Sequence, residues 1–553
     1  MLRLTEIRLS IEHHPSALRA AILTRLGVAS DELVRFDVFR RGVDARRRSA
    51  ILFIYTIDAE VRNEAGVLAR SRGDTRISAA PDTSYHFVGS RPASSLGHTT
   101  RPVIIGMGPA GLFAALILAQ SGFRPIVLER GKCVRERTKD TFAMWRGGVL
   151  NPESNTQFGE GGAGTFSDGK LHSQIKDPKH YGRKVLREFV AAGAPEEILF
   201  VSKPHIGTFR LVSMIEKMRA KIIELGGEIR FESRVDDIQF AEDVANSGLV
   251  RPRRVRAVGL AHGERIECDH VVLAVGHSAR DTFEMLHARG VYIEAKPFSI
   301  GFRIEHPQSL IDHCRLGDAA NHELLGAADY KLVHHAKNGR SVYSFCMCPG
   351  GTVVAATSEV DRVVTNGMSQ YSRNERNANA GIVVGITPEV DFPDGPLAGI
   401  ALQRELESRA FQLGGSNYFA PCQRVGDFLA KRASTTLGSV TPSYIPGVTP
   451  CDLSAALPAF AIDAIREAIP QFAKQLKGYD LADAVLTGVE TRTSSPVRIK
   501  RDDTDMQSVN CGGLYPTGEG AGYAGGILSA AVDGIRAAEA VTLSTIARAQ
   551  ARH

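Results

Sequence analysis

Short apolar runs separated by polar turns fill the first hundred residues. Alternating apolar and polar positions over residues 2–9 predict a strand, and the apolar pattern over 15–26 predicts a helix. Two more strand-like runs follow at 34–39 and 50–57, on either side of a basic tract at 40–48. The order predicts a small β-α-β-β unit of the ferredoxin-like kind.

The segment between residues 71 and 100 is rich in Ser, Gly, Pro, Asp and Thr, with few neighbouring apolar residues. Such composition is typical of a linker or of a segment draped over a surface. We therefore place a domain boundary near residue 95 and predict a small N-terminal α+β domain over residues 1–95.

At residue 102 the pattern changes to a strand, a turn, a helix and a second strand. The run 103–105 predicts a buried strand, 112–120 a helix, and 125–128 another strand that ends at Glu129. The turn between the first strand and the helix carries three glycines, Gly106, Gly108 and Gly111. This order, with an acid after the second strand, is typical of a Rossmann dinucleotide-binding site.

Each of the three glycines is required for a different physical reason in such a turn. Gly106 permits the tight turn, Gly108 lets the backbone approach a pyrophosphate, and Gly111 allows the helix to pack closely on the strand. The phosphates then lie at the helix N-terminus, where unpaired N–H groups and the helix dipole favour negative charge. Glu129 is expected to accept hydrogen bonds from the ribose hydroxyls of an adenosine.

A second glycine-rich segment, with Gly159, Gly161 and Gly164, lacks an apolar strand before it and an apolar helix after it. It is therefore not a second Rossmann turn. Two interpretations stay open at this stage. The segment either wraps a flat ligand with bare backbone, or forms a surface loop without a ligand.

Composition and charge narrow the class of protein. In 553 residues, 43% hydrophobic and 23% charged residues are ordinary globular values, and 54 glycines are roughly 10% where about 7% is usual. A formal charge of +6 suits an anionic cofactor as well as a nucleic acid. The eight cysteines are dispersed and form no CxxC pair, so neither a disulfide scaffold nor a zinc ribbon is expected.

No signal peptide or membrane-spanning run is evident. Residues 1–10 are interrupted by charges, and the longest apolar run, 112–119, is far shorter than the roughly 20 residues that a membrane-spanning helix needs. We expect a cytoplasmic protein with reduced thiols and no membrane partner.

Two later segments complete a family resemblance. A buried strand, 271–276, ends in glycine, and a strand with a Gly-Glu turn and a small-residue helix spans 513–534. Together with the first turn, they resemble the two-dinucleotide-binding-domain flavoproteins, whose FAD domain is of the glutathione-reductase type. More narrowly, runs such as 159–171 resemble an uncharacterised group of bacterial FAD-dependent dehydrogenases (NAD(P)/FAD-dependent oxidoreductases) related to the HI0933-like flavoproteins.

The resemblance implies an α/β fold with a Rossmann-like FAD domain, an inserted α+β domain and the small N-terminal domain. The FAD domain is expected in two parts, 101–285 and 481–553, with the inserted domain at 286–480 covering the flavin. No second Rossmann unit is present, so no dedicated NAD(P)H domain is expected. The residues expected to bind FAD are Gly106, Gly108, Pro109, Ala110, Gly111, Glu129, Arg130, Gly161, Gly164, Thr165, Lys170, Val235, Gly276, Gly518, Glu519, Gly525, Gly526 and Ile527.

The implied function is an FAD-dependent oxidoreductase that moves hydride between a small organic substrate and flavin N5, since the cofactor carries the electrons. The electron partner is left open between diffusible NAD(P)H, a carrier and oxygen, and no oligomeric state is predicted. The alternative from another class is an RNA-associated or RNA-modifying flavoprotein that uses its N-terminal domain for binding. Because the basic tract lacks interleaved aromatics, a solvated loop is favoured over nucleic-acid binding there.

The candidates for chemistry each have a structural alternative. Lys170 and His172 follow the second glycine segment and could stabilise charge or carry a proton near the flavin; otherwise they are a solvated lysine and a structural histidine. Tyr523 could face substrate or belong to the core. Cys346 and Cys348 alternate along a predicted strand and could form a redox pair, although buried apolar thiols are favoured.

Four polar residues beside apolar strands are further candidates for substrate binding. An arginine clamp for a substrate carboxylate is possible there, but internal ion pairs are favoured. Histidine spacing, including His334 and His335, gives no metal-binding pattern, so no metal is predicted. The four residues are Arg373, Arg376, Glu490 and Arg492.

Overall fold

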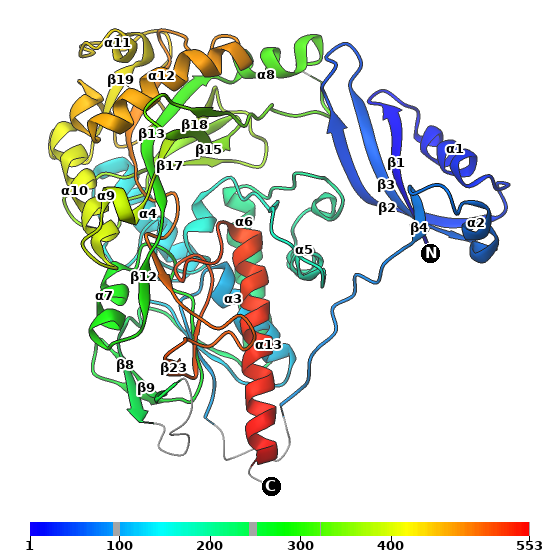
Figure 1. Ribbon diagram of the computed structural model, residues 1–553, viewed down its shortest axis with the longest axis horizontal. Coiled ribbons are helices and arrows are strands. Elements are labelled where there is room, and N and C mark those ends of the chain that lie inside the picture. The colour runs from blue at the N-terminus through cyan, green and yellow to red at the C-terminus, as the bar shows by residue number, and fades with distance from the viewer. Residues whose placement is uncertain (92–99, 243–250, 321, 552–553) are drawn as a thin grey trace.

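The computed structural model describes residues 1–91, 100–242, 251–320 and 322–551. It contains a small N-terminal unit, a unit built on a parallel sheet and a unit built on a large, mostly antiparallel sheet (Figure 1). The predicted α/β class is confirmed. In the view of Figure 1 the large sheet lies above the parallel one, and the N-terminal unit lies to one side.

The N-terminal unit is a four-stranded antiparallel sheet with two helices, in the strand order β2-β3-β1-β4. Chain order β-α-β-β-α-β is that of ferredoxin-like units. The predicted boundary near 95 lies within residues 92–99, outside the described residues. The elements are β1 (Leu2–Ser10), α1 (Pro15–Leu26), β2 (Leu33–Asp44), β3 (Leu52–Val61), α2 (Glu64–Arg70) and β4 (Ile77–Ala79).

Strand β2 continues beyond the predicted end at residue 39 and includes the start of the basic tract. Its extension pairs with the segment around residue 201, where the Arg41 N–H donates to the Phe200 carbonyl at 2.6 Å. The Phe39 ring lies between two guanidinium groups, Arg3 at 3.6 Å and Arg183 at 4.5 Å from its centroid. The N-terminal unit thus docks on the main body through β2, because backbone pairing and cation–π contacts replace solvation there.

Five parallel strands form the central sheet in the order β24-β11-β5-β6-β7. The strand order reverses beside β5, and such a switch point is where open α/β sheets bind ligands, at the carboxyl ends of the strands. The strands are β5 (Val103–Ile105), β6 (Ile126–Leu128), β7 (Glu228–Arg230), β11 (Val271–Leu273) and β24 (Leu514–Pro516).

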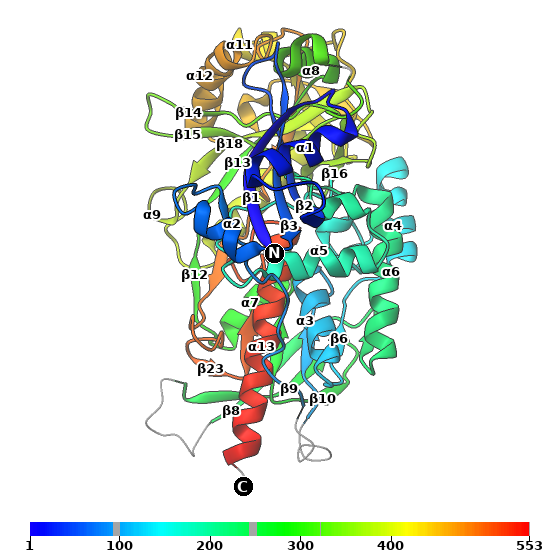
Figure 2. The same cartoon turned by 90° about the vertical axis from the view of Figure 1, so that its right-hand side faces the viewer.

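Helices cover this sheet, and a smaller sheet of β8, β9, β10 and β23 lies beside it. Helix α13 runs through the lower half of the molecule (Figure 2) and packs on α3. The helices are α3 (Pro109–Gln120), α4 (Val134–Gly147), α5 (Tyr181–Ala191), α6 (Thr208–Glu224), α7 (Arg280–Ala288) and α13 (Ile527–Ala551). The strands of the smaller sheet are β8 (Val235–Glu242), β9 (Arg253–Leu260), β10 (Arg265–Glu267) and β23 (Cys511–Gly512).

The inserted domain carries a seven-stranded sheet in the order β14-β15-β18-β13-β21-β19-β20. This sheet includes β21, so it continues ten residues past the boundary predicted at 480, and the chain returns to the parallel sheet after Glu490. Its strands are β13 (Phe298–Pro307), β14 (Val333–His335), β15 (Ser341–Cys348), β18 (Asn377–Ile386), β19 (Ala420–Arg424), β20 (Val448–Pro450) and β21 (Val485–Glu490).

Helices and two short strand pairs complete the inserted domain. Strand β12 pairs with β22 across the two chain crossings between the domains, and β16 pairs with β17. These elements are β12 (Ile293–Ala295), β16 (Gly351–Ala355), β17 (Thr365–Ser369), β22 (Val497–Ile499), α8 (Gln308–Leu316), α9 (Pro388–Asp391), α10 (Ala398–Leu413), α11 (Val425–Leu429) and α12 (Ala459–Gln475). Among the described residues, no helix combines the length and apolar character needed to cross a membrane.

The contact between α3 and α13 depends on glycine at one position. A Cβ built on Gly534 would lie 2.1 Å from the carbonyl oxygen of Ala110. We predict that Gly534→Ala forces the helices apart and lowers the free energy of unfolding by roughly 1–3 kcal/mol. Chemical unfolding of the variant and the unsubstituted protein measures this difference in the free energy of unfolding. The matched control is Gly385→Ala, because an added Cβ there has no atom within 4 Å; equal effects of the two variants would contradict the prediction.

Candidate functional site

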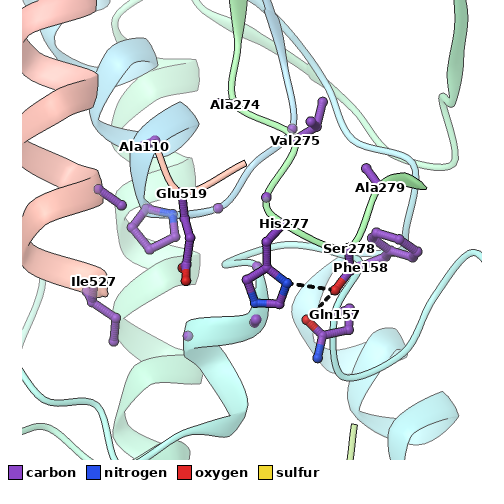
Figure 3. A pocket seen from close by; sticks show the side chains of 18 of the residues that line it. Ala110, Gln157, Phe158, Ala274, Val275, His277, Ser278, Ala279, Glu519 and Ile527 are labelled. Carbon is purple, nitrogen blue, oxygen red and sulfur yellow. Dashed lines mark hydrogen bonds between the residues drawn. The ribbon is translucent and has the colours of Figure 1, made fainter. Parts of the chain in front are cut away.

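The carboxyl ends of β5, β11 and β24 meet at one pocket, which encloses about 240 Å³ between the parallel sheet and the inserted domain (Figure 3). Each strand leads into a turn that lines it, and the three turns come from parts of the chain hundreds of residues apart. The turns contribute Gly106 and Gly108, Gly276 and His277, and Thr517 and Glu519.

Helix α3 points its N-terminus into this pocket. Gly108 is the N-cap and supplies no side-chain hydrogen bond, and Pro109 follows at the first helical position. The first N–H groups of α3 therefore have no side-chain cap, which is the arrangement that accepts a phosphate. Gly111 does not line the pocket; a Cβ there would lie 1.9 Å from the Gly106 carbonyl oxygen, so glycine is required for helix packing.

The second glycine segment lies directly on the first. A Cβ on Gly162, whose φ is +62°, would come 2.9 Å from the Gly108 Cα. Residues 154–161 are buried, and Gly159, Gly162 and Gly164 line the pocket. The alternative of a surface loop is wrong for this segment, because it forms a wall of the pocket with bare backbone.

Glu129 joins the two glycine segments. Its buried carboxylate accepts hydrogen bonds from the N–H groups of Met107 at 2.8 Å, Gly131 at 2.9 Å and Gly159 at 2.9 Å. A carboxylate has about four acceptor sites, so capacity for roughly one more donor remains. Glu129 also lines the pocket. The acid that the motif predicts for a ribose thus has a structural role as well.

Two arginines support this wall. Arg130 lies 4.1 Å from the centroid of Phe158, and ion pairs with Glu153 and Asp281 hold it there. Arg137, which sequence reasoning missed, is fully buried, and its guanidinium donates to the carbonyl groups of residues 155, 156 and 160 at 2.7–2.9 Å. No local signal marks Arg137, because its partners become neighbours only through folding.

Glu519 points into the pocket (Figure 3), and its carboxyl has no hydrogen-bond partner among the described residues. Burial raises the pKa of Glu519 from 4.5 to about 7, although the charge of Lys296 opposes this. Gly518, in contrast, faces away from the pocket. Its N–H donates to Asp533 at 2.8 Å, and a Cβ there would lie 2.8 Å from that of Ala110.

Sequence reasoning also missed His277 and Ser278, which follow the glycine at the end of β11. In Figure 3 the His277 ring lies in the pocket, with Nδ1 3.0 Å from the Ser278 hydroxyl, which is itself 3.1 Å from Gln157 Oε1. Burial, with the charges of Arg492 and Arg280, lowers the pKa of His277 to about 3. The imidazole is therefore neutral near pH 7.

The inserted domain forms the wall of the pocket that faces the dinucleotide turns. Lys170, which follows the second glycine segment, contacts β15 of the inserted domain there. The Lys170 ammonium donates to the Met347 carbonyl and lies 3.7 Å from the Asp168 carboxylate. Cys346 is exposed to the pocket and Cys348 is buried beside it; both thiols are free. Burial raises the pKa of both. A bulge between residues 345 and 348 disturbs the strict alternation that the sequence predicted.

Most of the predicted FAD-binding residues come together around this pocket. Those that line it are Gly106, Gly108, Pro109, Ala110, Glu129, Arg130, Gly164, Lys170, Val235, Gly276, Glu519, Gly525, Gly526 and Ile527. Gly161 and Thr165 line a small adjoining cavity, while Gly111 and Gly518 pack behind the wall. His172 is exposed outside the pocket lining. Tyr523 also lies outside it, its ring 3.8 Å from the Arg501 guanidinium.

Three of the four polar candidates form ion pairs, as the favoured interpretation held, and the exposed Arg376 does not. Arg373 pairs with Asp168, and Glu490 pairs with Arg303 at 2.8 Å. Arg376 donates to the Thr441 carbonyl at 3.2 Å. Arg492 both pairs with Glu407 and lines the pocket. In the described part of the chain, no group of three His, Cys, Asp or Glu side chains is placed to hold a metal ion.

Comparison with known proteins identifies relatives of the whole chain and of its parts. A family described as "FAD-dependent protein, C-terminal domain-like" matches residues 297–493, and a domain of unknown function (DUF8436) matches residues 1–60. An uncharacterized protein of Clostridium beijerinckii is 46% identical over 544 residues, which are 97% of this chain and 98% of that protein.

Two solved structures are more distantly similar. The halogenase PltM in complex with phloroglucinol and FAD is 10% identical, with a TM-score of 0.38 over 82% of this chain and 71% of the halogenase. Glycine oxidase from Bacillus cereus is 12% identical, with a TM-score of 0.30 over 81% of this chain and 96% of the oxidase.

The chain belongs to the same family as the Clostridium beijerinckii protein. Its cofactor is FAD, as the match over residues 297–493 indicates, and the glycine turns with the uncapped N-terminus of α3 fit a dinucleotide. The more specific relation to the HI0933-like flavoproteins stays a prediction, as does a cytoplasmic location.

The raised pKa of Glu519 gives a test of the pocket's burial. Since the folded-state pKa lies above the unfolded value, the stability that protonated Glu519 contributes is present below about pH 4.5 and is lost as the pH rises through about 7. In flavin-free protein, Glu519→Gln should therefore stabilise by roughly 2–3 kcal/mol at about pH 8 and little at about pH 4.5. Chemical unfolding at the two pH values measures the difference.

The exposed carboxylate Glu389 provides the control, since Glu389→Gln should have the same small effect at both pH values. A Glu519→Gln effect that does not change with pH would show that this carboxyl is hydrated rather than buried.

Proposed function

We propose that this member of the family is an oxidoreductase that transfers hydride between a small organic substrate and FAD. One observation carries the proposal: a single pocket is lined on one side by the dinucleotide turns and on the other by polar groups of the inserted domain. Such an interface between domains is where ligands commonly bind, with a few convergent polar groups in apolar surroundings.

The proposed arrangement of FAD follows the walls of the pocket. The pyrophosphate lies at Gly106–Ala110, on the N-terminus of α3. The adenosine extends toward Glu129, Arg130 and Val235, where the carboxyl end of β6 meets β8. The flavin end extends toward residues 525–527 at the start of α13, so that the ring faces the wall of the inserted domain.

When bound, FAD supplies the hydride acceptor or donor at N5, and the protein supplies orientation and charge. The N-terminus of α13 carries partial positive charge that favours an anion at the flavin end. The Lys170 ammonium adds a full positive charge on the opposite wall. Cys346 and Phe345 border the same space and would contact a substrate held against the ring.

The RNA-associated alternative depended on the basic tract, and part of this tract is engaged within the chain. Arg41 lies 5.0 Å from the centroid of Phe53 and 5.3 Å from that of Phe200, which places it against protein. Arg46 donates twice to the Asp44 carboxylate. Arg40, Arg46, Arg47 and Arg48 are exposed, so these contacts count against the alternative only at Arg41.

Anaerobic titration tests the proposed reaction. The purified protein, loaded with FAD, is mixed with NADH, NADPH and a panel of small organic donors while the oxidised flavin band is followed. We expect at least one of them to bleach the band stoichiometrically at a rate well above that of free FAD. Uniform failure of all donors, with FAD bound, would contradict the oxidoreductase proposal while leaving the cofactor assignment intact.

Substitution at Gly108 tests the proposed pyrophosphate position. A Cβ built there lies 3.7 Å from its nearest neighbour, the Gly162 Cα, so the folded chain accommodates a methyl group. The same methyl lies where the backbone must approach the phosphates, and Gly108→Ala should weaken FAD binding at least roughly tenfold with unchanged unfolding. Gly385→Ala is the matched control. Unchanged FAD affinity in Gly108→Ala would show that the pyrophosphate lies elsewhere.

A further inference from the structure

We propose that His277 presents an unprotonated Nε2 to the pocket and accepts a hydrogen bond there from an O–H or N–H group of FAD. Ser278, Gln157 and Arg492 act as positioning residues that fix this tautomer. The inference depends on FAD occupying the pocket and not on the reaction proposed for it.

The orientation of the Gln157 amide is determined by a backbone carbonyl. Its Nε2 donates to the Ala356 carbonyl at 3.1 Å, and a carbonyl only accepts. The other atom of the amide, Oε1, therefore faces the Ser278 hydroxyl, 3.1 Å away. Because an amide oxygen cannot donate, the single proton of the Ser278 hydroxyl must point to Gln157.

Arg492 then takes one of the two lone pairs of the Ser278 hydroxyl. Its Nη1 donates to Ser278 Oγ at 3.1 Å, and a guanidinium has no acceptor. The remaining contact of the hydroxyl is His277 Nδ1, 3.0 Å away. Since the hydroxyl proton is already used, this contact is a hydrogen bond only if Nδ1 carries the proton. In a neutral ring, Nε2 is then the bare acceptor.

Arg492 cannot easily turn away from Ser278, because buried partners hold the rest of its guanidinium. It donates to both oxygens of Glu407 at 2.9 and 3.0 Å and to Ser358 at 2.6 Å. Glu407 is itself fully buried and accepts from Arg280 at 2.6 and 3.0 Å. Arg280 also pairs with Glu359, so the cluster holds two guanidinium groups and two carboxylates. What disfavours the imidazolium is the burial of the His277 ring, together with the charges of Arg492 and Arg280, which Glu407 opposes.

The consequence is a fixed acceptor in the wall of the pocket. His277 Nε2 has no hydrogen-bond partner within the described ranges, and the ring projects into the pocket beside Glu519 (Figure 3). A phosphate cannot satisfy this acceptor, because it offers no proton near pH 7. The ribose and ribityl hydroxyls and the flavin N3–H can, so His277 selects the parts of FAD on either side of the pyrophosphate.

The tautomer is observable directly in the FAD-loaded full chain. Nitrogen NMR of ¹⁵N-histidine-labelled protein, with His277→Asn to identify the signal, should show Nδ1 protonated and Nε2 unprotonated. The signal should not titrate between about pH 6 and about pH 8. An Nε2–H tautomer, or an imidazolium in this range, would overturn the proposal. Ser278→Ala removes the acceptor for Nδ1–H and should change the His277 spectrum.

FAD affinity tests the acceptor itself, without any substrate. In flavin-free protein titrated with FAD, His277→Phe should raise the dissociation constant about five- to tenfold, because a donor of FAD loses its partner. His277→Gln, which can place Oε1 near the Nε2 position, should recover most of the affinity. Equal affinities for the Phe and Gln variants would overturn the proposal. If His277→Phe does not fold, the NMR spectrum of the unsubstituted protein still tests whether Nε2 is unprotonated.

Discussion

The Glu129 carboxylate is the interaction on which the site depends. Glu129 directly follows β6, and its carboxylate accepts hydrogen bonds from N–H groups of the first glycine turn, of Gly131 and of the second glycine segment. A buried carboxylate is tolerated only when it is well hydrogen-bonded, and these backbone donors supply that. In return, they fix two segments of bare backbone against each other, with Gly162 on Gly108. The shape of the dinucleotide pocket follows from this contact, since both segments line it.

A second set of buried charges joins the two large domains. Arg280 begins α7 beside the parallel sheet, Glu407 belongs to α10 of the inserted domain, and Arg492 lies between the domains. Removing one member of such a group typically costs about 3–5 kcal/mol, because it leaves a buried charge unpaired. The group therefore fixes the inserted domain relative to the parallel sheet, the two parts of the chain between which the pocket lies. It also reaches the pocket, because Arg492 donates a hydrogen bond to the Ser278 hydroxyl.

Local pattern was enough to predict the dinucleotide turn, because strand, glycines, helix and acid are all neighbours in sequence. It also predicted the β-α-β-β order of the first domain, although β2 runs five residues further than its apolar pattern, since backbone pairing with residues near 201 continues the strand. The roles of Arg137 and His277 were not predictable. Their partners lie far along the chain or are backbone carbonyls that residue type does not reveal. Tyr523 and His172, plausible by position, lie outside the pocket because neighbouring glycines do not determine where a side chain points.

In the proposed arrangement, FAD lies along the pocket with its pyrophosphate on α3 and its flavin end against the wall formed by Lys170 and Cys346. A crystal structure of the FAD-loaded protein would locate both ends of the cofactor. We expect phosphate oxygens within hydrogen-bond distance of the first N–H groups of α3, and the flavin ring between the start of α13 and β15. Phosphates bound elsewhere, or a flavin ring directed away from the inserted domain, would contradict it.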